Sequence, residues 1–187
     1  MCSDTTLIDK IWSQHSIREL DGDRTLLYVD RHFLHDGTSR QAFDGLRERK
    51  LDIADRDLTW AVVDHIVSTI PGRTTDSNPA GRERIAALRD NCAEFDVKFF
   101  DIDDPRQGIA HVIAPELGLT LPGTILVCGD SHTATNGGLG ALAWGIGTTE
   151  VLHVLATQTI SQLKPRQLRV SFTGRLQPGV TAKDLIL

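Results

Sequence analysis

Short apolar runs that are typical of β-strands alternate along this 187-residue chain with segments that repeat apolar residues at helical spacing. The predicted strands cover residues 25–30, 59–69, 97–102, 123–133 and 166–176. Helices are predicted over 5–17, from Ser39 onward, over 82–94 and 105–118, and once or twice within the apolar run 139–160. Strands separated by helices predict an α/β fold of three layers, with helices on both faces of a largely parallel sheet.

Charge and composition argue against several classes of partner. The net charge is −5 and there is no long run of lysine or arginine, which disfavours nucleic acid and membrane surfaces. No apolar segment reaches the ~20 residues that span a bilayer, and the N-terminus lacks the pattern of a secretory signal. The three cysteines, Cys2, Cys92 and Cys128, are widely spaced, so we expect a cytoplasmic protein without a disulfide framework.

Polar side chains occur at three places, each at or beyond the end of a predicted strand. Asp64 and His65 follow an apolar run, His111 lies beyond the next strand, and Asp130 and His132 flank a serine after "TILVCG". Because the carboxyl ends of parallel strands meet at one edge of a sheet, a single cleft can collect these groups. A carboxylate beside an imidazole fixes the ring's tautomer and raises its basicity, which suits the movement of protons and water.

Each of these groups also has a purely structural interpretation. The Asp64–His65 pair can cap a loop, His111 can be a semi-buried ring, and Asp130 can cap the helix that follows it. The glycines at 137, 138 and 140 do not form a dinucleotide or phosphate-loop fingerprint, and "GDSHT" is not a hydrolase nucleophile elbow. From composition and spacing alone, the sequence therefore indicates an α/β enzyme and nothing narrower.

The block "ILVCGDSHTATNGGLGALAWGIGTTEVLHVLATQT" resembles the signature of the aconitase superfamily of iron–sulfur hydro-lyases. Three further blocks occur in the order found in that family: "DRHFLHDGTSRQAFDGLR", "VDHIVST" and "GIAHVIAPELG". They are most similar to the isopropylmalate dehydratase branch of the family. The resemblance extends from about Leu26 to the end of the chain.

The resemblance implies three α/β domains around a [4Fe–4S] cluster, of which residues 1–187 would form the first and little more. It implies reversible dehydration and rehydration of a small hydroxy di- or tricarboxylic acid, and for this branch a step in leucine biosynthesis. One iron of the cluster would bind the substrate as a Lewis acid. The serine base that removes the carbon-bound proton would lie on a swivelling domain, which in this branch is a separate small subunit.

The resemblance also implies roles for individual residues. The catalytic set carried over from the family is Asp64, His65, His111, Asp130 and His132. Substrate contacts are implied for Gln41 and Ser131, an approach to the cluster for Asn136, and a carboxylate partner of His132 beyond residue 187.

The cluster ligands are expected outside this chain. The family uses one lone cysteine followed by a C-x-x-C pair, far downstream of these blocks. Cys128 does not match them by position, and Cys2 and Cys92 have no motif around them, so we expect no metal ligand here and no activity from this chain alone. The start of a helix at Thr181, six residues before the end, predicts that the chain stops inside an element.

Several departures from the family pattern leave the substrate open. The chain has "HDGTSRQAF" where "HEVTSPQAF" is expected, Ile66 in place of an asparagine, and "HTATNG" in place of "HTATHG". Arg40 either contacts a substrate carboxylate or faces solvent. A related hydro-lyase acting on homoaconitate or dimethylmalate is one alternative interpretation, and a non-catalytic fragment is another.

Overall fold

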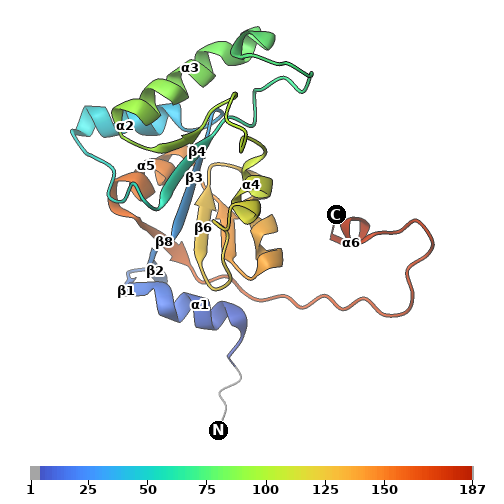
Figure 1. Cartoon of the computed structure of the whole chain (residues 1–187). Helices are drawn as coiled ribbons and strands as arrows, with labels where there is room; N and C mark the ends of the chain where they lie inside the picture. The colour runs from blue at the N-terminus through green and yellow to red at the C-terminus, as the bar shows by residue number, and fades with distance from the viewer. Residues whose placement is uncertain (1–4, 187) are drawn as a thin grey trace.

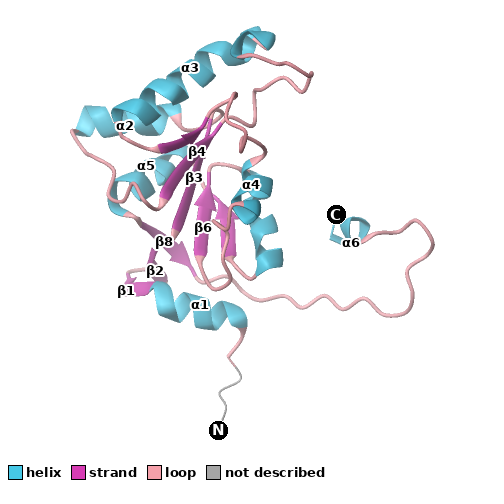
Figure 2. Cartoon of the chain, viewed as in Figure 1, coloured by secondary structure: helices cyan, strands magenta, loops and turns pink. Residues whose placement is uncertain are grey.

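A five-stranded sheet, parallel throughout, forms the centre of the computed structural model, which describes residues 5–186. Figure 2 shows the strands fanning across the middle of the molecule. Their order is β5-β4-β3-β6-β7. The strands are β3 (Arg31–His35), β4 (Thr59–Val62), β5 (Lys98–Phe100), β6 (Ile125–Cys128) and β7 (Leu142–Gly145).

Alternation along the strands separates two apolar cores, one on each face of the sheet. In β6, Ile125 and Val127 join one core, whereas Leu126 and Cys128 join the other. The larger core packs against α2 (Arg40–Arg49), α3 (Pro79–Glu94) and α5 (Thr148–Thr157). The smaller core packs against α4 (Ala110–Glu116) on the opposite face. The predicted three-layer α/β fold is therefore confirmed (Figure 1).

A second, antiparallel sheet extends one end of the domain. It consists of β1 (Ser16–Leu20), β2 (Arg24–Tyr28) and β8 (Thr159–Leu163), with β2 in the middle. Helix α1 (Leu7–His15) begins at a capping box between Thr6 and Asp9 and buries Ile11 and Trp12 in the larger core. The indole Nε1 of Trp12 donates to the hydroxyl of Thr25 on β2 at 3.3 Å, which ties the helix to this sheet.

The remaining elements are short. They are the 3₁₀ segments η1 (Thr75–Ser77) and η2 (Ser131–Leu139) and the helix α6 (Ala182–Ile186). Asp184 accepts hydrogen bonds from the backbone and hydroxyl of Thr181, so the predicted helix start at Thr181 is confirmed. None of the helices within residues 5–186 has the length and apolar character needed to cross a bilayer.

Several of the sequence predictions differ from the structure. The strands predicted over 59–69 and 123–133 are shorter than expected, because β4 ends at Val62 and β6 at Cys128. Within 139–160, one or two helices were predicted; the run forms one helix, α5, and also supplies strand β7 and the beginning of β8. Glycines at 145 and 147 separate β7 from α5, and glycine is a poor residue inside a helix. The strand predicted over 166–176 is wrong: the segment has no regular secondary structure, and Leu168, Val170 and Phe172 are exposed.

The sequence analysis also missed the central strand, β3. Arg31, His32 and His35 make this segment look polar, yet His32 and His35 are both buried. Neither ring nitrogen of His32 has a hydrogen-bond partner within residues 5–186, and burial lowers the pKa of the ring to about 3. The middle of the sheet therefore contains an uncharged histidine that takes the place of an apolar side chain.

This burial predicts a pH-dependent stability. The unfolded chain protonates His32 near its ordinary pKa of 6.5 but the folded chain only near 3, so stability is lost as the pH falls from 6.5 towards 3. At about pH 5 the loss from this group is about 2 kcal/mol relative to about pH 8. Urea unfolding at the two pH values should show a difference smaller by that amount in His32→Leu than in the unmodified chain. His153→Leu, at an exposed position on α5, is the matched control. An equal pH dependence for His32→Leu and the unmodified chain would contradict the prediction.

Candidate active site

The chain changes direction between β3 and β6, which lie side by side in the sheet. From β3 it proceeds outward through β4 to β5, then returns to the other edge of β3 as β6 and continues to β7. The connections after β3 and β6 therefore leave in opposite directions and open a crevice at the carboxyl ends of the two strands. His35, the last residue of β3, and Asp36 lie on one side of this crevice, and Asp130, which follows β6, lies on the other.

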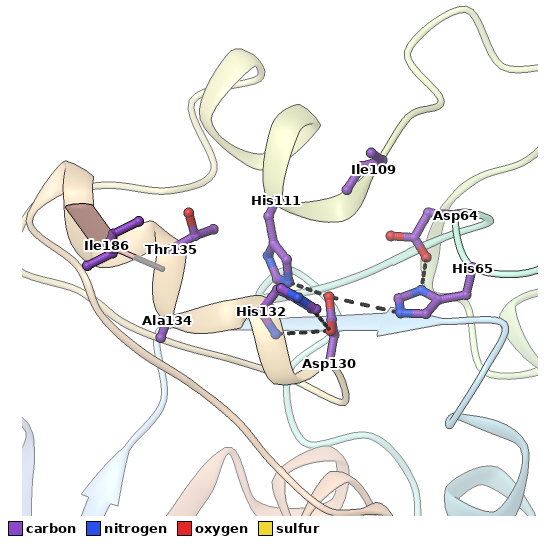
Figure 3. Close-up of a pocket in the computed structure, with 9 residues that line it drawn as sticks. All are labelled: Asp64, His65, Ile109, His111, Asp130, His132, Ala134, Thr135 and Ile186. Atoms are coloured by element: carbon purple, nitrogen blue, oxygen red, sulfur yellow. Dashed lines mark hydrogen bonds and ion pairs between the residues drawn. The ribbon is translucent and has the colours of Figure 1, made fainter. Parts of the chain in front are cut away.

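A cavity of about 700 Å³ lies at this edge of the sheet. Its volume is in the range of small-molecule sites. All five residues predicted to be catalytic line it, together with Ile109, Ala134, Thr135 and Ile186 (Figure 3). The five are Asp64, His65, His111, Asp130 and His132. The structure thus brings together side chains that are as much as 68 positions apart, from Asp64 to His132.

The carboxylate of Asp130 is the hub of this group, as the dashed lines in Figure 3 show. Its Oδ2 lies 2.9 Å from Nε2 of His111, and its Oδ1 lies 3.2 Å from Nδ1 of His132. Nε2 of His65 is 3.9 Å from the same Oδ2. Asp130 also caps η2 by accepting from the backbone N–H of His132 at 3.0 Å, so the capping interpretation is confirmed, and its catalytic role stays a prediction.

The surroundings of Asp130 keep it ionised. Burial alone would raise the pKa of the carboxyl, but hydrogen bonds from the backbone and ring of His132 outweigh it. With the nearby His111 and His65, they lower the pKa to about 2. A fixed negative charge therefore lies among three imidazoles at neutral pH.

Asp64 and His65 form the second carboxylate–imidazole pair. Nδ1 of His65 lies 2.5 Å from Oδ1 of Asp64, and the other oxygen of Asp64 accepts from the N–H of Ala110 at the start of α4. The hydrogen bond to Asp64 raises the pKa of His65, and this outweighs the opposing effect of partial burial. His65 therefore holds a proton more readily than His111, whose pKa burial lowers.

The sequence analysis did not identify Asp36, which holds the backbone of the Asp64–His65 pair in place. Asp36 is buried, and its carboxylate accepts three backbone N–H groups, from Asp64, His65 and Ile66, at 3.0, 3.1 and 2.7 Å. A carboxylate that bridges three consecutive amides fixes the loop that follows β4. The Asp36–Gly37 step after His35 signals a turn at this position, although it does not reveal which amides the carboxylate binds.

The sequence analysis also did not identify His35, which precedes Asp36 at the end of β3. Its ring is buried and stacks on that of His65, with centroids 3.8 Å apart and planes inclined by 17°. Nδ1 accepts from the N–H of Gly37, and the hydroxyl of Thr38 lies 3.1 Å from Nε2. Burial lowers the pKa of His35, and the neighbouring His65 lowers it further, so His35 is the neutral member of the stack.

Neither of the two residues predicted to contact substrate is among those that line the cavity. Ser131 is exposed on the first turn of η2, with its hydroxyl 3.4 Å from Nδ1 of His132, beside the cavity. Gln41 lies on α2 in a separate groove against α5, so the structure does not bring it to the Asp–His cluster. Arg40 is exposed next to it. From this segment of the chain it is His35, not Gln41, that reaches the cluster.

The described residues do not form an iron–sulfur ligand set. Cys92 and Cys128 are both buried, burial raises the pKa of each thiol, and they lie in different cores on opposite faces of the sheet. Cys2 lies outside the described residues. Ligand atoms of His35, Asp36, Asp64 and His65 lie within 4.8 Å of one another. However, backbone N–H groups already occupy both oxygens of Asp36, so we interpret this group as a hydrogen-bonded support.

Comparison with known proteins agrees with this geometry. The model of the aconitase family (aconitate hydratase) matches residues 9–187. The chain therefore belongs to the aconitase family, which is a family of hydro-lyases. It is 56% identical over 183 residues to "3-isopropylmalate dehydratase large subunit 1" of Bradyrhizobium diazoefficiens. The match covers 97% of this chain and 38% of that relative, so the chain spans well under half of the relative's length.

The Asp36 carboxylate gives a testable expectation. Asp36→Ala leaves three amides without an acceptor and should lower the free energy of unfolding by about 3 kcal/mol. It should also release the Asp64–His65 geometry, so that the pKa of His65 falls towards its ordinary value. Urea unfolding and NMR titration of the histidines measure the two effects. Asp44→Ala, which removes an exposed ion pair with Arg47, is the control and should cost less than about 1 kcal/mol. Similar losses in both variants would show that Asp36 does not hold this loop.

Proposed function

We propose that this chain is the N-terminal part of the large subunit of an iron–sulfur hydro-lyase that interconverts 2- and 3-isopropylmalate in leucine biosynthesis. The observation that supports it best is the convergence of His65, His111 and His132 around Asp130 at the carboxyl ends of a parallel sheet. Family membership and the name of the 56% identical relative support the same reaction class. A cytoplasmic location, expected from the cysteine pattern, belongs to the same proposal.

In this reaction a hydroxyl group leaves one carbon as water while the neighbouring carbon loses a proton, and the reverse addition restores the hydroxyl at the other carbon. The departing hydroxyl needs a proton donor. His65 suits that role because Asp64 raises its pKa and because the ring is partly exposed at the cavity. The proton passes from His65 to the departing hydroxyl, and rehydration returns it to the ring.

The other groups of the cavity suit the binding of a dicarboxylate. The side chain of His132 is 86% exposed, so it is free to reach a ligand while Asp130 holds its ring. Ser131 is its exposed neighbour and offers a hydroxyl donor from the same turn. Ile109 and Ala134 supply apolar surface on the cavity wall, which is compatible with a branched aliphatic substrate.

The rest of the machinery belongs to parts of the enzyme beyond this chain. We propose that cysteines from the remainder of the large subunit hold a [4Fe–4S] cluster, and that a small subunit carries the base that removes the carbon-bound proton. When bound, such a cluster supplies a Lewis acid for the substrate hydroxyl. Because Cys92 and Cys128 do not fit a ligand set, no step is assigned to the cluster from the residues of this chain.

Iron–sulfide reconstitution tests this division. Under anaerobic conditions, the chain should stay colourless and retain no iron after desalting, because the thiols of Cys92 and Cys128 are buried and lie on opposite faces of the sheet. The complete large subunit, treated in the same way, should turn brown. A stable brown product with this chain alone would overturn the assignment of the ligands to the remainder of the protein.

The complete enzyme with its small subunit tests the catalytic roles. His65→Gln should lower kcat about 10²–10⁴-fold, as expected for loss of a general acid. Activity should fall as the pH rises through the raised pKa of His65. Asp64→Asn should shift that alkaline limb to lower pH, because the ring loses the carboxylate that raises its pKa. Steady-state rates across pH measure both effects.

His153→Gln is the matched control, because this histidine is exposed on α5, which packs in the larger core on the face opposite α4. Near-normal rates for His65→Gln would remove the proposed proton donor. Rates with isopropylmalate, homocitrate and dimethylmalate decide the substrate. A preference for either of the latter two would keep the reaction class and replace the substrate, and no turnover of any would favour a non-catalytic role.

A further inference from the structure

The amide of Asn136 is held in a single orientation beside the cavity. Asn136 lies on η2 and is 1% exposed. One atom of its amide is 2.9 Å from the backbone carbonyl of Thr133, which can only accept a hydrogen bond, so that atom is the nitrogen Nδ2. The oxygen Oδ1 accepts from the buried hydroxyl of Thr120 at 2.8 Å, in the loop that follows α4.

This orientation decides which nitrogen of His111 carries a proton. The second hydrogen of Nδ2 is directed at Nδ1 of His111, 3.1 Å away. Because Nδ2 is a donor, Nδ1 has to be unprotonated and accept. In a neutral imidazole the proton then resides on Nε2, from which it is donated to Oδ2 of Asp130 at 2.9 Å.

We infer that Asn136 is a positioning residue that keeps His111 neutral, with its proton on Nε2, as a fixed hydrogen-bond donor to Asp130. A second proton on His111 would have to occupy Nδ1 and would face the N–H of Asn136, donor against donor. Both ring nitrogens are therefore engaged, and His111 supports Asp130 rather than exchanging protons with a ligand. This leaves the proton transfer proposed at the cavity to His65, whose pKa the hydrogen bond to Asp64 raises.

Burial lowers the pKa of His111 and favours the neutral ring, and the charged groups around it act in both directions. Asp130, after β6, and Asp64, after β4, both favour a protonated ring, whereas His132 disfavours it. Burial is the largest influence and lowers the pKa of His111 despite the two carboxylates. The donor from Asn136 acts in the same direction as burial.

Nitrogen NMR of the chain with isotope-labelled histidine tests the inference without any enzyme assay. In the unmodified chain, His111 should show an unprotonated Nδ1 and a protonated Nε2 throughout neutral pH. Asn136→Asp replaces the donor by an acceptor of the same shape. In that variant the proton affinity of His111 should rise at least tenfold, with Nδ1 protonated near neutral pH.

Asn91→Asp is the matched control, because it places a carboxylate at another buried asparagine, on α3, and should leave the spectrum of His111 unchanged. A proton on Nδ1 in the unmodified chain would overturn the inference, as would a titration of His111 that Asn136→Asp does not shift. If that variant fails to fold, the spectrum of the unmodified chain still decides. The inference deepens the proposed function, but its readout is independent of turnover, so either can fail without the other.

Discussion

The parallel pairing of β3 with β6 is the constraint on which the site depends. Its register places His32 opposite Val127 and Phe33 opposite Cys128, so the turns that follow the two strands emerge side by side. Gly129 makes this approach possible: a Cβ there would lie 2.1 Å from the hydroxyl oxygen of Thr38. The crevice between the two turns is therefore a consequence of sheet register and of one missing methyl group.

Within that crevice, the surroundings give chemically identical rings different protonation behaviour. His65 lies against Asp64 and has a raised pKa, whereas His35 and His111 are more buried and have lowered ones. Enzymes often separate acid and base roles in this way, by placing like groups in unlike environments. Asp130 contributes a charge that does not titrate near neutral pH, so its effect on the pKa values of the rings around it stays constant there.

The sequence predicted those parts of this arrangement that follow a clear apolar run, and it missed those that lie in polar-looking segments. Asp64, His65 and Asp130 follow clearly apolar runs, so both their strands and their meeting point were predicted. His32 and His35 made β3 look polar, and only burial between two neighbouring strands reveals the strand as central. The three amides bound by Asp36 could not be foreseen, because backbone partners leave no mark in residue types.

The stretch 166–176 shows the opposite error, because here the sequence predicted a strand that does not form. Alternating apolar residues form a strand only where another strand pairs with them. Its side chains at 168, 170 and 172 are 88%, 64% and 62% exposed, and its backbone pairs with no strand within the described part of the chain. Exposed apolar side chains that lie close together favour self-association in concentrated solution. A charged substitution at Phe172 would reduce that apolar surface and improve solubility.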